Sequence, residues 1–165
     1  MGDGTMATTW QLDPAHTSVE FTVKHMMFTT VRGRFPDVEG RITVNEENPA
    51  ASVVSVDMAA ASIDTGAADR DAHLRSGDFL DAETHEKLTF RSRRVEGLRL
   101  DEGASFTVVG DLTIRGTTRE VTLEATYQGR GQDPWGGQRV GFEAATKIDR
   151  REWGLEWNQA LEAGG

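Results

Sequence analysis

Apolar and polar residues alternate along most of this chain with a period of two. Val19, Phe21 and Val23, for example, are separated by Glu20 and Thr22. Successive side chains of a strand point to opposite faces, so this alternation is typical of a half-buried β-strand. The repeated pattern predicts about seven or eight short strands between residues 9 and 148.

Turn signals separate these stretches at close intervals. Arg115-Gly116-Thr117 interrupts the alternation and predicts a tight hairpin over Asp111–Tyr127, whereas Gly129–Gly137 is predicted to be a glycine-rich loop. Gly110 lies inside an apolar run, where it signals a bulge, a bend or room for a ligand. Many short strands at this spacing predict an all-β barrel or sandwich.

The alternation stops at Asp69–Asp81, where charges crowd together. Ala67–Arg75 contains no Pro, Gly or β-branched residue, so it is predicted to be a short helix, with Thr65 as its cap and Gly77 as its stop signal. A helix this short is marginal alone, and we expect it to lie across the body formed by the strands.

The charges of this segment are spaced to pair with one another along the helix. Asp69 precedes His73 by four residues, and Asp71 precedes Arg75 in the same way. A solvated, self-paired face is therefore a simpler interpretation than an active site.

Composition narrows the functional classes. The net charge of −9 argues against a nucleic-acid binder, the absence of Cys excludes disulfides and thiol chemistry, and no apolar run could span a membrane. We expect a polar, disordered tail over residues 1–8, one domain over 9–165, and a cytoplasmic protein without stable membrane insertion, since no signal peptide is evident.

No familiar catalytic or metal motif is present. The four histidines lack metal-ligand spacing, and neither an EF-hand loop nor a GxSxG elbow occurs. An enzyme would need His25 or His73 to meet Asp71 or Asp78 at a cavity mouth. We expect no enzyme, metal or cofactor, and keep catalysis on an apolar substrate as the second hypothesis.

The apolar face of the strands has two interpretations. An eight-stranded barrel can be filled by its own side chains, or it can hold one small ligand. A filled barrel acting as an interaction module is therefore a third hypothesis.

Blocks of residues along nearly the whole chain resemble the YceI-like family of lipocalin-like, polyisoprenoid-binding proteins. The matching blocks are Trp10, Leu12–Ser18, Phe21–His25, Val31–Phe35, Ser62–Gly66, Arg70–Ser76 with Asp78 and Phe79, Leu88–Ser92, Gly110–Arg119, and Arg150 with Trp153–Leu155.

The resemblance implies an antiparallel eight-stranded barrel with one short helix packed on it. It implies that the protein binds, and carries or stores, an isoprenoid or isoprenoid-quinone lipid inside the barrel. Family members are not established as enzymes, and many are secreted or periplasmic.

The chain departs from the family pattern at two places. It has His85-Glu86 where the family usually has Tyr-Pro, and it ends at Gly165, where the family continues for about one strand pair. An open edge left by a missing C-terminal strand would favour pairing with a second copy, so a homodimer remains open.

We assign the inward face by apolarity and predict a set of ligand-binding residues. They are Phe21, Val23, His25, Phe28, Phe35, Val56, Met58, Leu74, Phe79, Phe90, Leu112, Ile114, Phe142 and Trp153.

Overall fold

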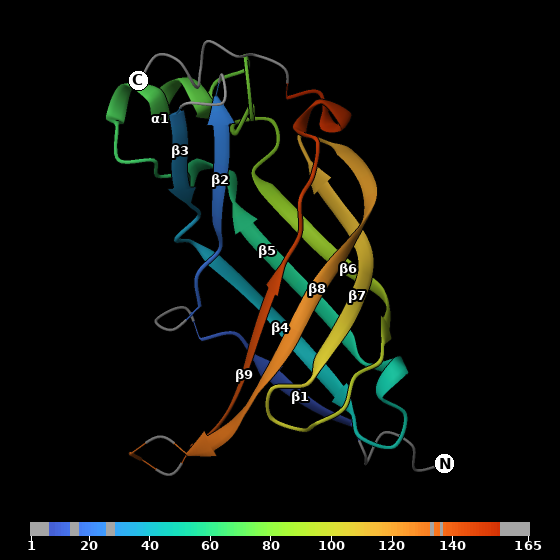
Figure 1. Cartoon of the computed structure of the whole chain (residues 1–165). Coiled ribbons are helices and arrows are strands. Elements are labelled where there is room, and N and C mark those ends of the chain that lie inside the picture. The colour runs from blue at the N-terminus through green and yellow to red at the C-terminus, as the bar shows by residue number, and fades with distance from the viewer. Residues whose placement is uncertain (1–6, 14–16, 26–28, 133, 136, 156–165) are drawn as a thin grey trace.

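The protein is a curved antiparallel β-structure with one short α-helix at one end (Figure 1). The computed structural model describes residues 7–13, 17–25, 29–132, 134, 135 and 137–155. The strands are β1 (Ala7–Gln11), β2 (Glu20–His25), β3 (Thr29–Arg34), β4 (Val38–Asn45), β5 (Val53–Ala59), β6 (Lys87–Glu96), β7 (Ser105–Ile114), β8 (Thr117–Gln132) and β9 (Gln138–Ala145). The helices are α1 (Ala68–Arg75) and three 3-10 turns, η2 (Pro49–Ala51), η3 (Ala60–Ser62) and η4 (Arg150–Trp153).

Seven strands form one sheet in the order β1-β4-β5-β6-β7-β8-β9, and β2 pairs with β3 in a separate two-stranded sheet. All seven neighbouring pairs are antiparallel, and the large sheet curls into a nearly closed barrel. The predicted all-β lipocalin-like barrel with one helix is therefore confirmed. The division of strands differs from a simple eight-stranded barrel, because the β2–β3 hairpin lies beside the large sheet rather than within it.

The two ends of the sheet, β1 and β9, face each other across a seam. No backbone ladder joins these strands among the residues that the structure describes. Arg139 on β9 instead forms an ion pair with Asp13, with 2.7 Å between Nη1 and Oδ2. Among the described residues, this side-chain ion pair therefore connects the segment after β1 with β9.

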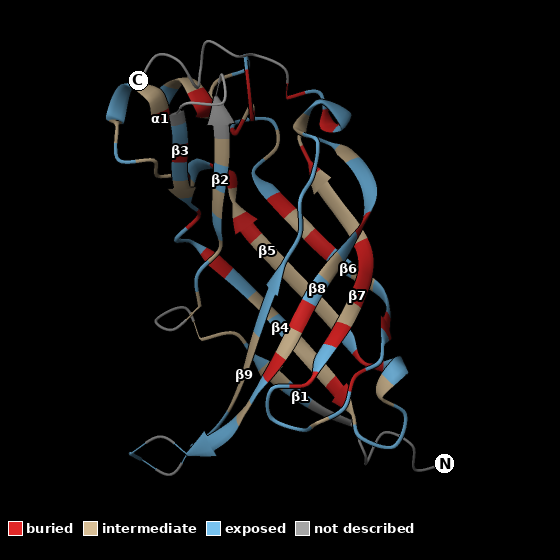
Figure 2. Ribbon diagram, in the orientation of Figure 1, coloured by how far each residue is buried: buried red, intermediate tan, exposed pale blue. Residues whose placement is uncertain are grey.

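The strand register defines the inner face of the barrel. Residues directly opposite each other in an antiparallel pair share a face, so Gly40, Val56, Phe90, Leu112 and Arg119 form one row across five strands. Figure 2 shows buried positions recurring along the strands and also in α1.

The outer face carries charges that pair between strands. Asp57 on β5 contacts Arg91 on β6 at 2.6 Å, and Asp111 on β7 contacts Arg93 at 2.9 Å. The hydrogen bond and charge of Asp111 raise the pKa of Arg93 above its ordinary value. The alternation seen in the sequence thus separates an apolar interior from a charged exterior.

The bulge signalled by Gly110 lies in the neighbouring strand. Gly110 pairs with Ser92, and the register of β6 then shifts between Ser92 and Arg94. A Cβ at position 110 would lie 2.6 Å from the carbonyl oxygen of Arg91 and 2.6 Å from Cζ of Phe90. The missing side chain therefore makes room for Phe90 and the β6 backbone rather than for a ligand.

Local turn chemistry explains the hairpin between β7 and β8. Arg115 and Gly116 have φ values of 50° and 75°, the left-handed conformation that a two-residue turn needs at both central positions. The predicted hairpin is confirmed, but the predicted loop over Gly129–Gly137 is wrong in its first part. β8 continues to Gln132, and Gly129 and Gly131 pair with β9.

Three further expectations concern the ends of the strand pattern and of the chain. Ile148, at the end of the stretch predicted to form strands, lies beyond β9 and is 41% exposed. Of the predicted tail over 1–8, residues 1–6 lie outside the described residues, and β1 already begins at Ala7. The question of a closing C-terminal strand falls on residues 156–165, which are also outside the described part.

α1 spans Ala68–Arg75, one residue shorter than predicted, and ends before Gly77 as expected. Thr65 does not cap it: Ala67 is the N-cap residue and makes no side-chain capping bond. Leu74, 1% exposed, belongs to the same buried apolar cluster as Phe79 and Leu80. Packing against the body of the protein, rather than capping, therefore stabilises this short helix.

Candidate functional site: an apolar barrel interior open at a seam

Several apolar side chains face the barrel interior but are only half-buried. Trp10 pairs with Ile42, and Ile42 pairs with Val54, so these three residues form an inward row over β1, β4 and β5. All three keep intermediate exposure. On the other side of the seam, Val140 and Phe142 on β9 are also half-buried. Apolar surface that faces inward yet reaches solvent can accept an apolar ligand.

A cavity of about 300 Å³ lies where the two edges of the sheet meet. Trp10 and Val44 line it from β1 and β4, together with Glu46 just beyond β4. Arg130 and Gln138 line it from β8 and β9. Its volume is at the lower end of small-molecule pockets, and its lining combines apolar and polar groups.

Arg130 is the cation of this cavity. Its Nε donates to the Tyr127 hydroxyl at 3.4 Å, and its Nη2 lies 3.2 Å from Oε1 of Glu46. Tyr127 is 2% exposed and packs against Phe142, with 5.4 Å between the ring centroids. The hydrogen bond to Tyr127 and the carboxylate of Glu46 raise the pKa of Arg130 above its ordinary value. The guanidinium is therefore a fixed positive charge at the cavity.

The structure divides the predicted ligand-binding residues into three groups. Buried in the core are Phe35, Met58, Leu74, Phe79, Phe90, Ile114 and Trp153. Half-buried and packed against that core are Phe21, Val23, Val56, Leu112 and Phe142. Phe28 and the side chain of His25 lie outside what the structure describes.

These groups occupy different parts of the molecule. Trp153 on η4 donates from Nε1 to the carbonyl of Leu112 at 2.9 Å, so its polar atom serves the β7 backbone. The ring of Phe21 lies over Gly33 and packs against Phe35, with 5.6 Å between the centroids. Of the predicted set, Phe142 lies on β9, an edge strand at the seam, and Val56 lies on β5, on the same face as Val54.

Pattern analysis missed the residues that line the cavity. Val44 shows only the alternation typical of a strand, and Trp10 enters only through the family resemblance. Arg130 lies in the segment predicted to be a glycine-rich loop, and nothing in the sequence singles out Glu46. The available signal was the two-residue spacing of Gln138 and Val140, which places them on one strand face, but the glycines between Gly129 and Gly137 indicated a loop.

His73 and Asp78 do meet, with 3.1 Å between Nε2 and Oδ2, but neither lines the cavity at the seam. The nearby Ser76 hydroxyl donates to the backbone carbonyl of His73 at 2.6 Å rather than to its ring. These contacts therefore stabilise the C-terminal end of α1. The Ser76 hydroxyl is not hydrogen-bonded to the imidazole, as an activated nucleophile would be.

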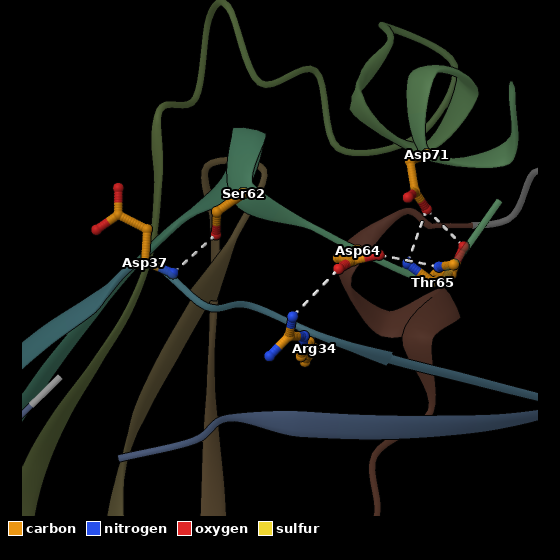
Figure 3. A network of polar contacts seen from close by, with 7 residues as sticks. Arg34, Asp37, Ser62, Asp64, Thr65 and Asp71 are labelled. Carbon is orange, nitrogen blue, oxygen red and sulfur yellow. Dashed lines mark hydrogen bonds and ion pairs between the residues drawn. The ribbon is translucent and has the colours of Figure 1, made fainter. Parts of the chain in front are cut away.

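The buried carboxylate of the charged segment is also accounted for. Asp71, 7% exposed, accepts from the amide of Thr65 at 2.9 Å and from its hydroxyl (Figure 3). Arg70 donates to the hydroxyl and the carbonyl of the same threonine. Arg34 and Asp64 exchange backbone hydrogen bonds at 3.0 and 2.9 Å. The backbone amide of Asp37 donates to the Ser62 hydroxyl at 3.3 Å. This network ties α1 to β3.

Within the described residues, no group of three or more His, Asp or Glu side chains is placed to hold a metal ion. None of the helices in that part of the chain has the length and apolar character to cross a bilayer.

Known proteins resemble this chain over most of its length. The model of the YceI-like domain matches residues 10–165. A protein named YceI from Escherichia coli O17:K52:H18 is 42% identical over 86% of this chain and 72% of its own length. A UPF0312 protein from Pseudomonas aeruginosa LESB58 is 39% identical over 92% of this chain and 78% of its own.

Solved structures share the fold. The YceI protein of Campylobacter jejuni superposes with a TM-score of 0.68 at 29% identity, covering 92% of this chain and 84% of its own. A polyisoprenoid binding domain from Saccharophagus degradans superposes with a TM-score of 0.57 at 13% identity, covering 94% and 80%. The match of the family model across residues 10–165, together with this barrel, shows that the chain belongs to the YceI-like family.

Proposed function

We propose that the protein binds a long apolar amphiphile, of the isoprenoid or isoprenoid-quinone class, inside its barrel and carries or stores it without chemical change. The observation that supports this most directly is the half-buried inward row of Trp10, Ile42 and Val54 beside the cavity at the seam. The Saccharophagus degradans domain of the same fold is described as polyisoprenoid-binding, which agrees with an apolar ligand.

The energetics require a ligand of several isoprene units. Burial of one CH₂ contributes about 0.8 kcal/mol, so two five-carbon units supply roughly 8 kcal/mol before the costs of association. Micromolar affinity needs about 8 kcal/mol net. A longer tail must therefore extend from the cavity along the interior, where Val140 and Phe142 offer further apolar surface.

Two neighbouring positions allow a matched test. Val54 faces the interior, whereas Val53 is 50% exposed on the other face of the same strand. We expect Val54→Trp to weaken binding of geranylgeraniol at least tenfold, and Val53→Trp to leave it within about threefold. Displacement of an environment-sensitive apolar dye measures the affinity, and circular dichroism verifies that both variants fold. Val56→Trp is the second variant, should Val54→Trp not fold.

Native mass spectrometry of protein purified from cells provides an independent check. Extractable apolar ligand supports the proposal. Bare protein, together with no saturable binding of geranylgeraniol, contradicts it.

The open edges of β1 and β9 support a homodimer as the alternative role of the seam. Neither edge has a second strand partner within the described residues, and exposed edges favour pairing with another copy. Sedimentation over a range of concentrations tests this. If the protein is a monomer at every concentration, the dimer proposal fails and the ligand proposal is unaffected.

A further inference from the structure

The cavity at the seam is lined by three exposed polar residues, here called its polar end, and by two apolar residues that are more buried. Arg130, Glu46 and Gln138 are exposed residues with polar side chains, whereas Val44 is 3% exposed and Trp10 is half-buried. An amphiphile bound here would place its polar group among the first three residues and its chain against the others.

The register shows where the chain would go. Val140 is the direct partner of Arg130 across β8 and β9, and Phe142 is the partner of Tyr127 one step further along. On the opposite edge, Ile42 follows Val44 on the same face of β4 and pairs with Trp10. Apolar residues therefore continue from the polar end into the interior along both sides of the seam.

The charges at the polar end balance. Arg130 contributes one positive charge and Glu46 one negative charge, and their 3.2 Å ion pair occupies an Nη2 donor of the guanidinium. Tyr127 accepts from Nε. A phosphate would have to displace Glu46 from Arg130 or lie beside its carboxylate, in a protein whose net charge is already −9.

An uncharged oxygen meets no such opposition. A guanidinium carries five N–H donors, so Arg130 can donate to a hydroxyl or carbonyl while it keeps both present partners. The amide of Gln138, on the same cavity wall, can donate or accept as well.

We infer that this cavity is the head-group end of the ligand site, and that Glu46 makes it selective for an uncharged hydroxyl or carbonyl head over a phosphorylated one. Glu46 acts as a specificity-determining residue by neutralising Arg130. The inference rests on the proposed function, since it assigns the polar end of the same ligand.

The test compares two probes with the same tail, geranylgeraniol and geranylgeranyl monophosphate. We expect the wild-type protein to bind the alcohol at least tenfold more tightly than the phosphate. Glu46→Gln keeps the size of the side chain and removes its charge. It should strengthen phosphate binding at least tenfold and change alcohol binding by less than threefold.

Glu47→Gln is the matched control. Glu47 is the next residue and is exposed, and it does not line the cavity. It changes the net charge of the protein by the same amount, so its effect on phosphate binding should stay within threefold.

The outcomes separate the two proposals. If the wild-type protein binds the phosphate as tightly as the alcohol, or if the two Gln variants behave alike, the head-group inference is overturned and apolar binding stands. If neither probe binds, the proposed function itself fails and the head-group inference falls with it.

Discussion

The Asp71 carboxylate accepts both the amide and the hydroxyl hydrogen of Thr65, six residues earlier in the chain. Asp71 lies in the first turn of α1 and is 7% exposed, so its charge is compensated by these bonds rather than by water. These two hydrogen bonds fix the conformation of the loop that leads from the Arg34–Asp64 bridge into the helix (Figure 3).

Removing this carboxylate should destabilise the fold. Asp71→Ala leaves the Thr65 amide and hydroxyl without their acceptor, and hydrogen bonds to charged groups contribute about 1.5–3 kcal/mol each. We expect the free energy of unfolding to fall by about 3 kcal/mol in urea denaturation. Asp69→Ala, at an exposed position of the same helix, should change it by less than about 0.5 kcal/mol. Equal effects would mean that the segment is a surface loop without a structural role.

Leu74 should be the most sensitive apolar position of α1. It is 1% exposed, and truncation of such a residue removes its burial and leaves a cavity. Leu74→Ala should cost about 2–5 kcal/mol. Leu74→Asp and Phe79→Asp should cost more, because each adds an unpaired buried charge. Ala72→Ser, on the exposed side of the same helix, is the reference, and an equally large loss there would contradict the assignment of the buried face.

Gly110 and Gly131 offer a pair of glycines with opposite surroundings. A Cβ at position 110 would meet the Arg91 carbonyl oxygen at 2.6 Å and Cα of Ser92 at 2.8 Å, whereas a Cβ at 131 would meet nothing within 4 Å. Overpacking of a rigid site costs about 1–3 kcal/mol. Thermal unfolding should therefore show a clear loss for Gly110→Ala and a change near zero for Gly131→Ala. A tolerated alanine at 110 would show that β6 can move away.

Acid should weaken the cap of η4. Asp149 caps this turn through the amide of Arg151, and its side-chain hydrogen bond with Arg151 lowers its pKa below the ordinary value of an aspartate. A carboxyl whose folded pKa is depressed stabilises the fold above its unfolded pKa, and this contribution is lost as the pH falls through the folded value. A carbon-detected NMR titration should give a midpoint for Asp149 below the ordinary value of an aspartate. In Asp149→Asn, the unfolding free energy should depend less on pH below about pH 4, and an unchanged dependence would remove this role.

Local chemistry explains which parts of the fold could be predicted. The turn at Arg115 and Gly116 needs only a positive φ at two adjacent residues, and the flanking alternation fixes the hairpin. The interval without alternation likewise marked α1, because its composition differs from every strand around it.

Long-range geometry explains what could not be predicted. The partner of Asp71 was expected one turn along the helix at Arg75, but the carboxylate turns back to Thr65 because the loop brings two unpaired donors to it. The continuation of β8 through Gly129 and Gly131 depends on pairing with β9, which a glycine-rich sequence does not reveal. Trp10 and Arg130 share a cavity only because the sheet curls until its first and last strands meet.

The seam removes one of the constraints that fix the diameter of a barrel. In a barrel closed by backbone hydrogen bonds, strand number and stagger set the diameter. Here, within the described residues, the perimeter between β1 and β9 is completed by flexible side chains, including those of Asp13 and Arg139. Separation of these two edges would break no ladder among the described strands. If the barrel binds an apolar chain as proposed, chains of different thickness can then be bound by the same set of strands.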